Sequence, residues 1–333
     1  MKLNYQIYKL NLKETFSISY GNYSFREALI VTLSSNEISG YGECTAIDYY
    51  KIDLQSYLKI LNENQSRIEN QKIVSPQEFY NFLSTLQLPN FLKSALDCAY
   101  WDLFGKLERK PFFELTANTA SSSIPESSLT ISIASIKTQI EKIKKSKWSK
   151  FKVKCNHFSE ADLIELSNLN IPIAIDSNAS FKIANCNRIA SLEIATNFQY
   201  FEQPMQTGFE NYKYLNVNSY PNWMADEDLQ DVSQLKNLQN HYQSVNIKLM
   251  KCGGLTPALH LIQEAKKLNF KIMIGCMTES TIGISAGAVL APMADFVDLD
   301  GANLIANDIA NGTKIKNGII EFSEKHGLGI ELK

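Results

Sequence analysis

Short apolar runs recur through the last two thirds of the chain and constrain its fold more than any other feature. The runs are LTISI at 129–133, FKVKC at 151–155, IPIAID at 171–176, FQYFE at 198–202, NWMAD at 222–226, VNIKL at 245–249, FKIMIG at 270–275 and FVDLD at 296–300. Successive runs end roughly 22 to 27 residues apart, the spacing of a β-strand plus its crossover helix. Eight such units predict a parallel sheet covered by helices. Closure into a barrel is favoured because the glycine fingerprints of an open dinucleotide fold are absent.

The first third has the pattern of an α+β domain. Residues 2–12, 27–34 and 41–44 have the composition of strands, and a loop from Ser17 to Tyr23 joins the first two. From about Ser75 the periodicity becomes helical. We predict an α+β domain at 1–115 and a barrel domain at 116–310, with 311–333 completing the first domain.

Composition bounds the partners and the location. The 333 residues include 33 Lys and Arg against 35 Asp and Glu, so the net charge of −2 gives no general attraction for nucleic acid or anionic membranes. No stretch approaches the roughly 18 apolar residues of a membrane helix, and the N-terminus does not resemble a signal peptide. Six widely spaced cysteines predict reduced thiols and a cytoplasmic protein. We expect a small-molecule substrate, and a homo-oligomer is compatible with this composition.

Charged residues end most of the apolar runs, where a barrel enzyme carries its active site. Asp176, Glu202 and Asp226 end three consecutive runs, so their carboxylates can converge on one point. Three anions share a site only around a cation, and ligands that are all oxygen favour Mg²⁺, with Mn²⁺ as an alternative. The structural explanation of the same residues would be three independent helix caps.

Lysines end two runs on opposite sides of these carboxylates. Lys154 and Lys248 are placed to act as acid and base on the two faces of one carbon atom. Lys152 lies on the same strand face as Lys154, and repulsion between the two ammonium groups is expected to lower the lysine pKa. A lone lysine there is usually a solvated rim residue, but an opposed pair beside a metal site predicts proton transfer.

The ordered motifs resemble the enolase superfamily, in its muconate-lactonising-enzyme subgroup. They are SALDCAYWDLFGK, K-V-K at 152–154, D-S-N at 176–178, E-Q-P at 202–204, A-D-E at 225–227, I-K-L-M-K-C-G-G at 247–254 and G-L-G-I at 327–330. The resemblance implies an α/β fold, a modified TIM-type (β/α)7β barrel with an α+β N-terminal capping domain. By resemblance, Lys154 and Lys248 are the paired bases, and Lys152 tunes Lys154 and steadies an enolate. The implied Mg²⁺ ligands are Asp176, Glu202 and Asp226.

The pattern D-L-D at 298–300 narrows the resemblance to the dipeptide epimerases, in which an aspartate pair grips the α-ammonium group of a dipeptide. Asp298 and Asp300 would attract a cation and repel the dianionic substrates of muconate cycloisomerase or o-succinylbenzoate synthase. A turn after the last strand would also place aspartates there. Four further residues are predicted to line the substrate pocket: Tyr20, Thr130, Cys276 and Thr278.

The chain departs from this family pattern in the N-terminal loop. Epimerases of L-Ala-D/L-Glu often carry an arginine there, and the spacing from Phe16 places Gly21 at that position. Arg26 and Lys51 are candidate substitutes, so the second residue of the dipeptide stays open between acidic and hydrophobic.

The predicted reaction inverts the α-carbon of the second residue of a dipeptide by Mg-assisted proton transfer between two lysines. Cell-wall peptide metabolism is the usual setting of such enzymes. The alternatives are a cycloisomerase or o-succinylbenzoate synthase on the same scaffold, or a non-catalytic metal-binding barrel.

Overall fold

Eight short parallel strands form one sheet within residues 1–116, 123–218 and 220–333, the residues that a computed structural model describes. The neighbour order in the sheet follows the chain order from β4 to β11. The strands are β4 (Leu129–Ile131), β5 (Phe151–Lys154), β6 (Ile173–Asp176), β7 (Phe198–Glu202), β8 (Trp223–Ala225), β9 (Ser244–Ile247), β10 (Lys271–Gly275) and β11 (Phe296–Asp298). Ser127 bridges Val297, and Ser128 N donates to Val297 O at 2.9 Å, so the first and last strands meet and close the predicted barrel.

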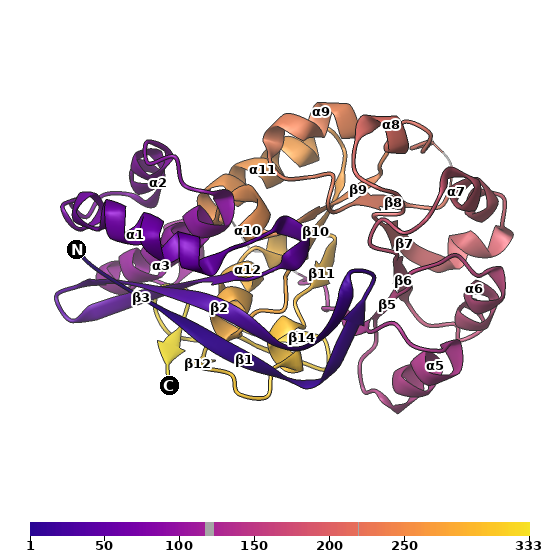
Figure 1. The fold of residues 1–333 in the computed structure, drawn as a ribbon, viewed down its shortest axis with the longest axis horizontal. Coiled ribbons are helices and arrows are strands. Elements are labelled where there is room, and N and C mark those ends of the chain that lie inside the picture. Colours follow the sequence, from indigo (N-terminus) through magenta and orange to yellow (C-terminus); the bar gives the residue numbers. More distant parts are fainter. Residues whose placement is uncertain (117–122, 219) are drawn as a thin grey trace.

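Helices between the strands cover the outside of the barrel (Figure 1). They are α5 (Ile136–Lys145), α6 (Glu160–Ser167), α7 (Ile183–Ala190), α8 (Phe209–Tyr212), α9 (Leu235–Leu238), α10 (Leu249–Cys252), α11 (Leu255–Lys267) and α12 (Thr281–Ala288). In α11 the buried residues Leu255, Ala258, Leu261 and Ala265 recur at three- and four-residue intervals. One face of this helix is therefore apolar and packs on the strands.

The N-terminal α+β part, called here the capping domain, contains an antiparallel sheet and four helices. The sheet comprises β1 (Lys2–Ile18), β2 (Gly21–Ser35) and β3 (Ile38–Thr45), and the helices are α1 (Leu54–Glu69), α2 (Pro76–Ser84), α3 (Asn90–Glu108) and α4 (Phe112–Leu115). The predicted loop from Ser17 to Tyr23 is too long. Phe16 pairs with Tyr23 and Ile18 with Gly21, because residues of high β propensity continue the hairpin almost to its tip.

Buried polar contacts join the capping domain to the barrel. Asp97 of α3 accepts hydrogen bonds from Thr256 N and Thr256 Oγ1 at the start of α11, both at 2.8 Å. Glu43 of β3 accepts from Ser280 N, just before α12, at 3.0 Å. These contacts fix the capping sheet beside the carboxyl ends of the barrel strands.

The C-terminal segment contacts both parts of the molecule. It contains the short strands β12 (Ala310–Asn311), β13 (Lys314–Lys316), β14 (Ile319–Glu321) and β15 (Glu331–Leu332). Leu328 N donates to Asp102 Oδ1 of α3 at 2.8 Å, while Gly318 O accepts from Ser127 N beside β4 at 2.8 Å. The assignment of 311–333 to the capping domain stays a prediction.

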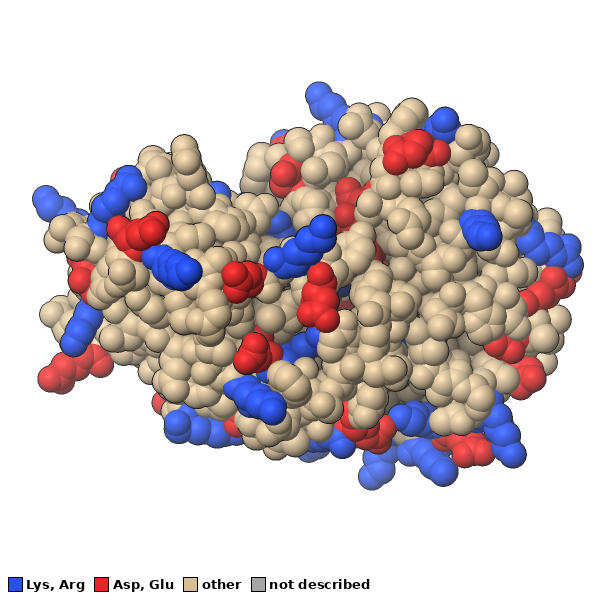
Figure 2. All heavy atoms as spheres, in the orientation of Figure 1, with Lys and Arg blue, Asp and Glu red and all other residues tan. Residues whose placement is uncertain are grey.

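The surface has no dominant sign of charge on the face that Figure 2 shows, where basic and acidic side chains alternate. Among the helices in the described ranges, each falls short of the length or the apolar content needed to cross a bilayer.

Candidate active site

A cavity lies between the carboxyl ends of the barrel strands and the capping domain. Most of the residues predicted for the site line it: Tyr20, Thr130, Lys152, Lys154, Asp226, Lys248, Cys276, Thr278, Asp298 and Asp300. Asp176 and Glu202 are not part of its lining and lie beneath the floor, at 0% and 1% exposure. The structure therefore brings together side chains from β4, β5, β9 and β11 that are far apart in the sequence.

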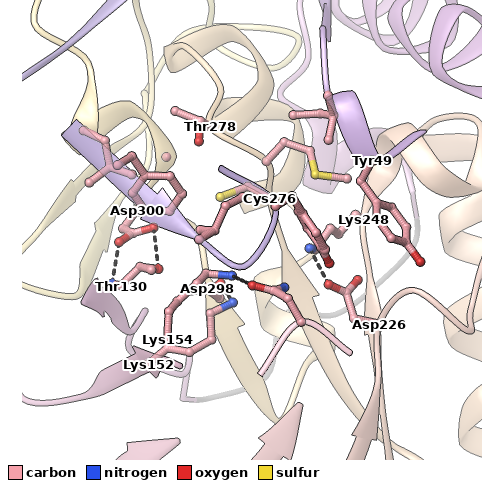
Figure 3. Close-up of a pocket in the computed structure, with 18 of the residues that line it drawn as sticks. Tyr49, Thr130, Lys152, Lys154, Asp226, Lys248, Cys276, Thr278, Asp298 and Asp300 are labelled. Atoms are coloured by element: carbon pink, nitrogen blue, oxygen red, sulfur yellow. Dashed lines mark hydrogen bonds and ion pairs between the residues drawn. The ribbon is translucent and has the colours of Figure 1, made fainter. Parts of the chain in front are cut away.

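The two predicted base lysines lie on opposite walls of the barrel. Lys154 ends β5 and Lys248 follows β9, and three strands separate β5 from β9 in either direction around the sheet. Lys154 Nζ lies 2.6 Å from Asp176 Oδ2, and Lys248 Nζ lies 2.7 Å from Asp226 Oδ2. Figure 3 shows Lys154 beside Lys152 on one side of the cavity and Lys248 beside Asp226 on the other.

The three predicted metal ligands come from adjacent strands. Asp176 of β6 pairs in register with Glu202 of β7, and Asp226 follows β8. Asn246 Nδ2 donates to Glu202 Oε1 at 2.7 Å, but Glu202 Oε2 accepts no hydrogen bond within the described ranges and lies 3.2 Å from Lys152 Nζ. Burial raises the pKa of Glu202 to about 8 against the opposing charge of Lys152.

These carboxylates suit a hard divalent cation by their chemistry, but they do not surround one point as they stand. In the part of the chain that the structure describes, no three His, Cys, Asp or Glu side chains form a group that could hold a metal ion. Asp176 turns one oxygen towards Lys154, and Asp226 turns its two oxygens towards Lys248 and Lys251. The donors are all oxygen atoms, and the second oxygen of Glu202 is buried without a hydrogen bond, so the donor set fits Mg²⁺ or Mn²⁺.

Lys152 lies among three carboxylates. Its Nζ pairs with Asp298 Oδ2 and lies 3.2 Å from Glu202 Oε2 and 3.6 Å from Asp176 Oδ2. Burial alone would lower the pKa of Lys152, but the three carboxylates outweigh burial and raise that pKa well above its ordinary value. Burial likewise lowers the pKa of Lys248, but neighbouring carboxylates, Asp226 first, outweigh burial and raise that pKa above its ordinary value. For Lys152, the neighbouring carboxylates therefore outweigh the repulsion from Lys154 that was expected to lower its pKa.

The aspartate pair at the end of β11 forms an acidic corner of the cavity. Ser128 Oγ donates to Asp298 Oδ1 at 2.8 Å, and Thr130 N donates to Asp300 Oδ2 at 2.6 Å (Figure 3). Burial, and then the charge of Asp298, raise the pKa of Asp300 to about 7. A cation in this corner would relieve the repulsion and restore the charge of Asp300.

The capping domain supplies an aromatic roof. Tyr20, at the tip of the β1–β2 hairpin, donates a hydrogen bond to Glu227 Oε1, and its ring centroid lies 4.8 Å from that of Tyr49. Tyr50 lies next to Tyr49, with 4.9 Å between ring centroids. The hairpin tip therefore reaches across the cavity to the residue that follows Asp226.

Arg26, and not Lys51, lies in the cavity wall. Arg26 is 5% exposed, its guanidinium carbon lies 3.5 Å from the centre of the Tyr23 ring, and its Nε has no hydrogen-bond acceptor among the described residues. The Tyr23 hydroxyl in turn donates to Asp48 Oδ2 at 3.0 Å. Lys51 is exposed and does not line the cavity.

Sequence reasoning assigned no role to two buried residues that support the site. Lys251 Nζ lies 2.6 Å from Asp226 Oδ1 and donates to Asn246 O at 3.0 Å. Its position three residues after Lys248, on a single helical turn, was the available signal. Glu227 is 6% exposed, and its Oε2 accepts no hydrogen bond within the described ranges. Burial, followed by the charges of Asp226 and Asp176, raises the pKa of Glu227 to about 7.

Known proteins share both the sequence and the fold. The enolase C-terminal domain-like family model matches residues 136–333. An L-Ala-D/L-amino acid epimerase from Maribacter sp. is 38% identical over 343 aligned residues, covering 100% of this chain and 99% of the relative.

Two crystal structures have the same architecture over nearly the full chain. An enolase family member from Agrobacterium tumefaciens, described as homologous to dipeptide epimerases and holding sodium and L-Ala-L-Glu, is 26% identical, with a TM-score of 0.86 and coverage of 97% of this chain and 98% of that one. A dipeptide epimerase from Methylococcus capsulatus complexed with Mg is 25% identical, with a TM-score of 0.82 and full coverage of both chains, 100% and 100%. The family match and the relative that is 38% identical along the whole chain show that the protein belongs to the enolase C-terminal domain-like family, within the enolase superfamily that its motifs predicted.

Proposed function

We propose that the protein is an epimerase of dipeptides that begin with L-alanine and inverts the α-carbon of the second residue. The name of the Maribacter relative supports this substrate class, and the Methylococcus structure supports the use of Mg²⁺. The observation that carries the proposal is the pair Lys154 and Lys248, half a barrel turn apart, on either side of one cavity.

Inversion requires a base on one face of the α-carbon and an acid on the other. One lysine, as the free amine, accepts the α-proton, and the other, as the ammonium, donates a proton to the opposite face. Lys154 and Lys248 exchange these tasks when the stereochemistry of the substrate is reversed. Lys152, held between Asp298 and Glu202, keeps a positive charge close to the carboxyl group where the enolate charge develops.

The metal ligands are proposed to be Asp176, Glu202 and Asp226. A Mg²⁺ ion held by these residues, or Mn²⁺ in its place, would supply positive charge for the substrate carboxylate and for the enolate. Asp176 and Asp226 would then share their negative charge between the metal ion and the lysines with which they pair, Lys154 and Lys248.

The remaining contacts orient the dipeptide. Asp298 and Asp300 would bind the α-ammonium group, since carboxylates in a buried corner favour a cation. The same corner would repel the dianionic substrates of a cycloisomerase or o-succinylbenzoate synthase. Cys276 and Thr278 would form the adjoining wall, and Tyr20 would close the roof and exclude water from the proton transfer.

The setting is proposed to be the cytoplasm. All six cysteines are free thiols, which supports a reducing compartment. Turnover of cell-wall dipeptides would supply a substrate of the proposed class in that compartment.

The test is deuterium exchange. The protein is incubated with Mg²⁺ and a library of L-Ala-L-Xaa dipeptides in D₂O, and mass spectrometry follows gains of one dalton at the α-carbon of the second residue. A preparation carrying both Lys154→Ala and Lys248→Ala, purified in the same way, measures any contaminating epimerase. We expect exchange with the natural chain only. No exchange across the library would overturn the proposal and direct attention to muconate and o-succinylbenzoate substrates.

A further inference from the structure

A second cavity lies against the acidic corner of the first, outside the site described above. Its walls include Leu129 and Ile131 of β4, and it shares three lining residues with the active-site cavity: Phe16, Thr130 and Leu304. These three residues therefore form a partition between two spaces. The capping domain contributes Phe16, and the barrel contributes the other two.

Two hydrogen bonds join the capping side of the partition to the barrel. Ile133 N, just after β4, donates to Ser17 O at 3.0 Å, and Lys13 Nζ donates to Asn303 O at 2.8 Å. Both contacts tie β1 to the barrel on either side of Phe16. Phe16 therefore lies where the hairpin contacts the barrel beside β4, whereas Tyr20 at the hairpin tip contacts Glu227 across the cavity.

The partition also lies next to the group proposed to bind the substrate ammonium. Thr130 N donates to Asp300 Oδ2 at 2.6 Å, so the acidic corner and the partition share a residue. In a dipeptide the α-carbon of the first residue is one bond from the ammonium nitrogen. Its side chain must therefore begin within a few bonds of Asp300, where Phe16 and Leu304 limit the space.

We propose that Phe16 sets the size limit for the side chain of the first residue of the dipeptide. This inference rests on the proposed function, in which Asp298 and Asp300 bind the ammonium group. With Phe16 in place, only a small side chain such as that of alanine fits in front of the partition. Without its ring the two cavities join, and the space beside the half-buried Leu129 becomes available to a larger side chain, with the Lys142–Glu14 ion pair at its outer wall.

The test compares Phe16→Ala with the natural chain on dipeptides that differ only in their first residue. Alanine, valine, leucine and phenylalanine occupy the first position, and the second residue is held constant. Phe25→Ala is the matched control, because Phe25 is on the same hairpin, 41% exposed, and lines neither cavity. Leu304→Ala shortens the barrel's own side chain in the partition. This second variant allows the test to be made even if Phe16→Ala does not fold.

We expect Phe16→Ala, or Leu304→Ala, to raise the ratio of kcat/KM for Leu-Xaa over Ala-Xaa by about 10-fold or more, since a pocket of changed size discriminates by such factors. Phe25→Ala should leave that ratio unchanged. If both partition variants fold, turn over Ala-Xaa and keep the natural ratio, the size limit is not at Phe16. That result differs from a failure of the proposed function, in which the natural chain itself turns over no dipeptide.

Discussion

The floor and the roof of the cavity are built from different kinds of side chain. The floor, at the ends of the barrel strands, consists of buried lysines and carboxylates that neutralise one another, as in Lys154 with Asp176 and Lys248 with Asp226. The roof, from the capping domain, is mainly aromatic and aliphatic, with Tyr20 at its tip and Arg26 at its edge. Burying a charge is costly unless it is paired, so each buried charge in the floor depends on a partner of opposite sign.

The roof contains few buried charges that need a partner. An aromatic or aliphatic side chain can be exchanged for another without leaving an unpaired charge, so the roof can change with the substrate while the floor keeps the reaction. We therefore expect substitutions in the floor to change the rate for every substrate, and substitutions in the roof to change the choice among substrates.

Loss of a base lysine tests the floor and should have the largest effect. Lys154→Ala and Lys248→Ala should each lower kcat for epimerisation by about 10³-fold or more, because one face of the α-carbon loses its acid or base. Each variant should keep α-proton exchange with only one stereoisomer of the substrate, measured in D₂O. Lys147→Ala, at an exposed position, is the control. Normal turnover by both single variants would end the two-base mechanism.

The floor could be predicted in detail because it follows from a periodic pattern. Each apolar run ends within two residues of its strand, and parallel strands bring those ends to one rim, so the placement of Asp176, Lys154 and Lys248 could be predicted without knowing any loop. The pattern could not predict which lysine pairs with which carboxylate. Lys251 bonds to Asp226 from a helical turn after β9, and the pKa of Lys248 depends on carboxylates whose distances only the fold sets.

Neutralising the acidic corner should have a smaller effect, confined to binding. Asp300→Asn removes a charge that would contact the substrate ammonium, and a charged hydrogen bond of this kind contributes about 1.5–3 kcal/mol. We expect KM for dipeptides to rise by about 10- to 100-fold with little change in kcat. Asp300 is a cleaner position than Asp298, which also pairs with Lys152. An unchanged KM would argue against the ammonium assignment.

The roof was harder to predict because its side chains reach the cavity from a hairpin whose exact length decides which way each one points. The sequence placed a loop from Ser17 to Tyr23, whereas the strands continue to Ile18 and resume at Gly21. Arg26 therefore lies on a paired strand facing the cavity, and Lys51 is exposed. Composition alone could not separate the two candidate cations.

Substitution of Arg26 should lower kcat/KM by about 10-fold only for dipeptides whose second residue is acidic. The buried guanidinium, with Nε free of an acceptor in the described part of the chain, is suited to an acidic side chain at the second residue. Arg26→Gln should lower kcat/KM for L-Ala-L-Glu by about 10-fold and leave L-Ala-L-Leu nearly unchanged. Lys51→Gln is the matched control and should leave both values alone. An equal loss for the two dipeptides would assign Arg26 to the stability of the roof instead.

The contact between Asp97 of α3 and Thr256 of α11, called here the seam, joins the capping domain to the barrel. Its loss should change stability without changing catalysis. Burial raises the pKa of Asp97 from 3.8 to about 7 against the hydrogen bonds from Thr256. The folded protein therefore holds a proton that the unfolded chain releases above about pH 4, so the stability that this proton provides is complete in acid and is lost as the pH rises through 7.

Asp97→Asn should remove that pH dependence. The shift of about three pKa units corresponds to at most about 4 kcal/mol of unfolding free energy between pH 4 and 8. Thermal unfolding followed by circular dichroism should therefore show a smaller fall in Tm from pH 5 to 8 for Asp97→Asn than for the natural chain or for Glu37→Gln, at an exposed position. At pH 8, kcat/KM should stay within about twofold, because Asp97 does not line the cavity and its carboxylate accepts hydrogen bonds from Thr256 at the start of α11. A large loss of activity with an unchanged dependence of Tm on pH would mean that the contact between Asp97 and Thr256 positions the roof for catalysis. The roof would then contribute to the reaction rate and not only to the choice of substrate.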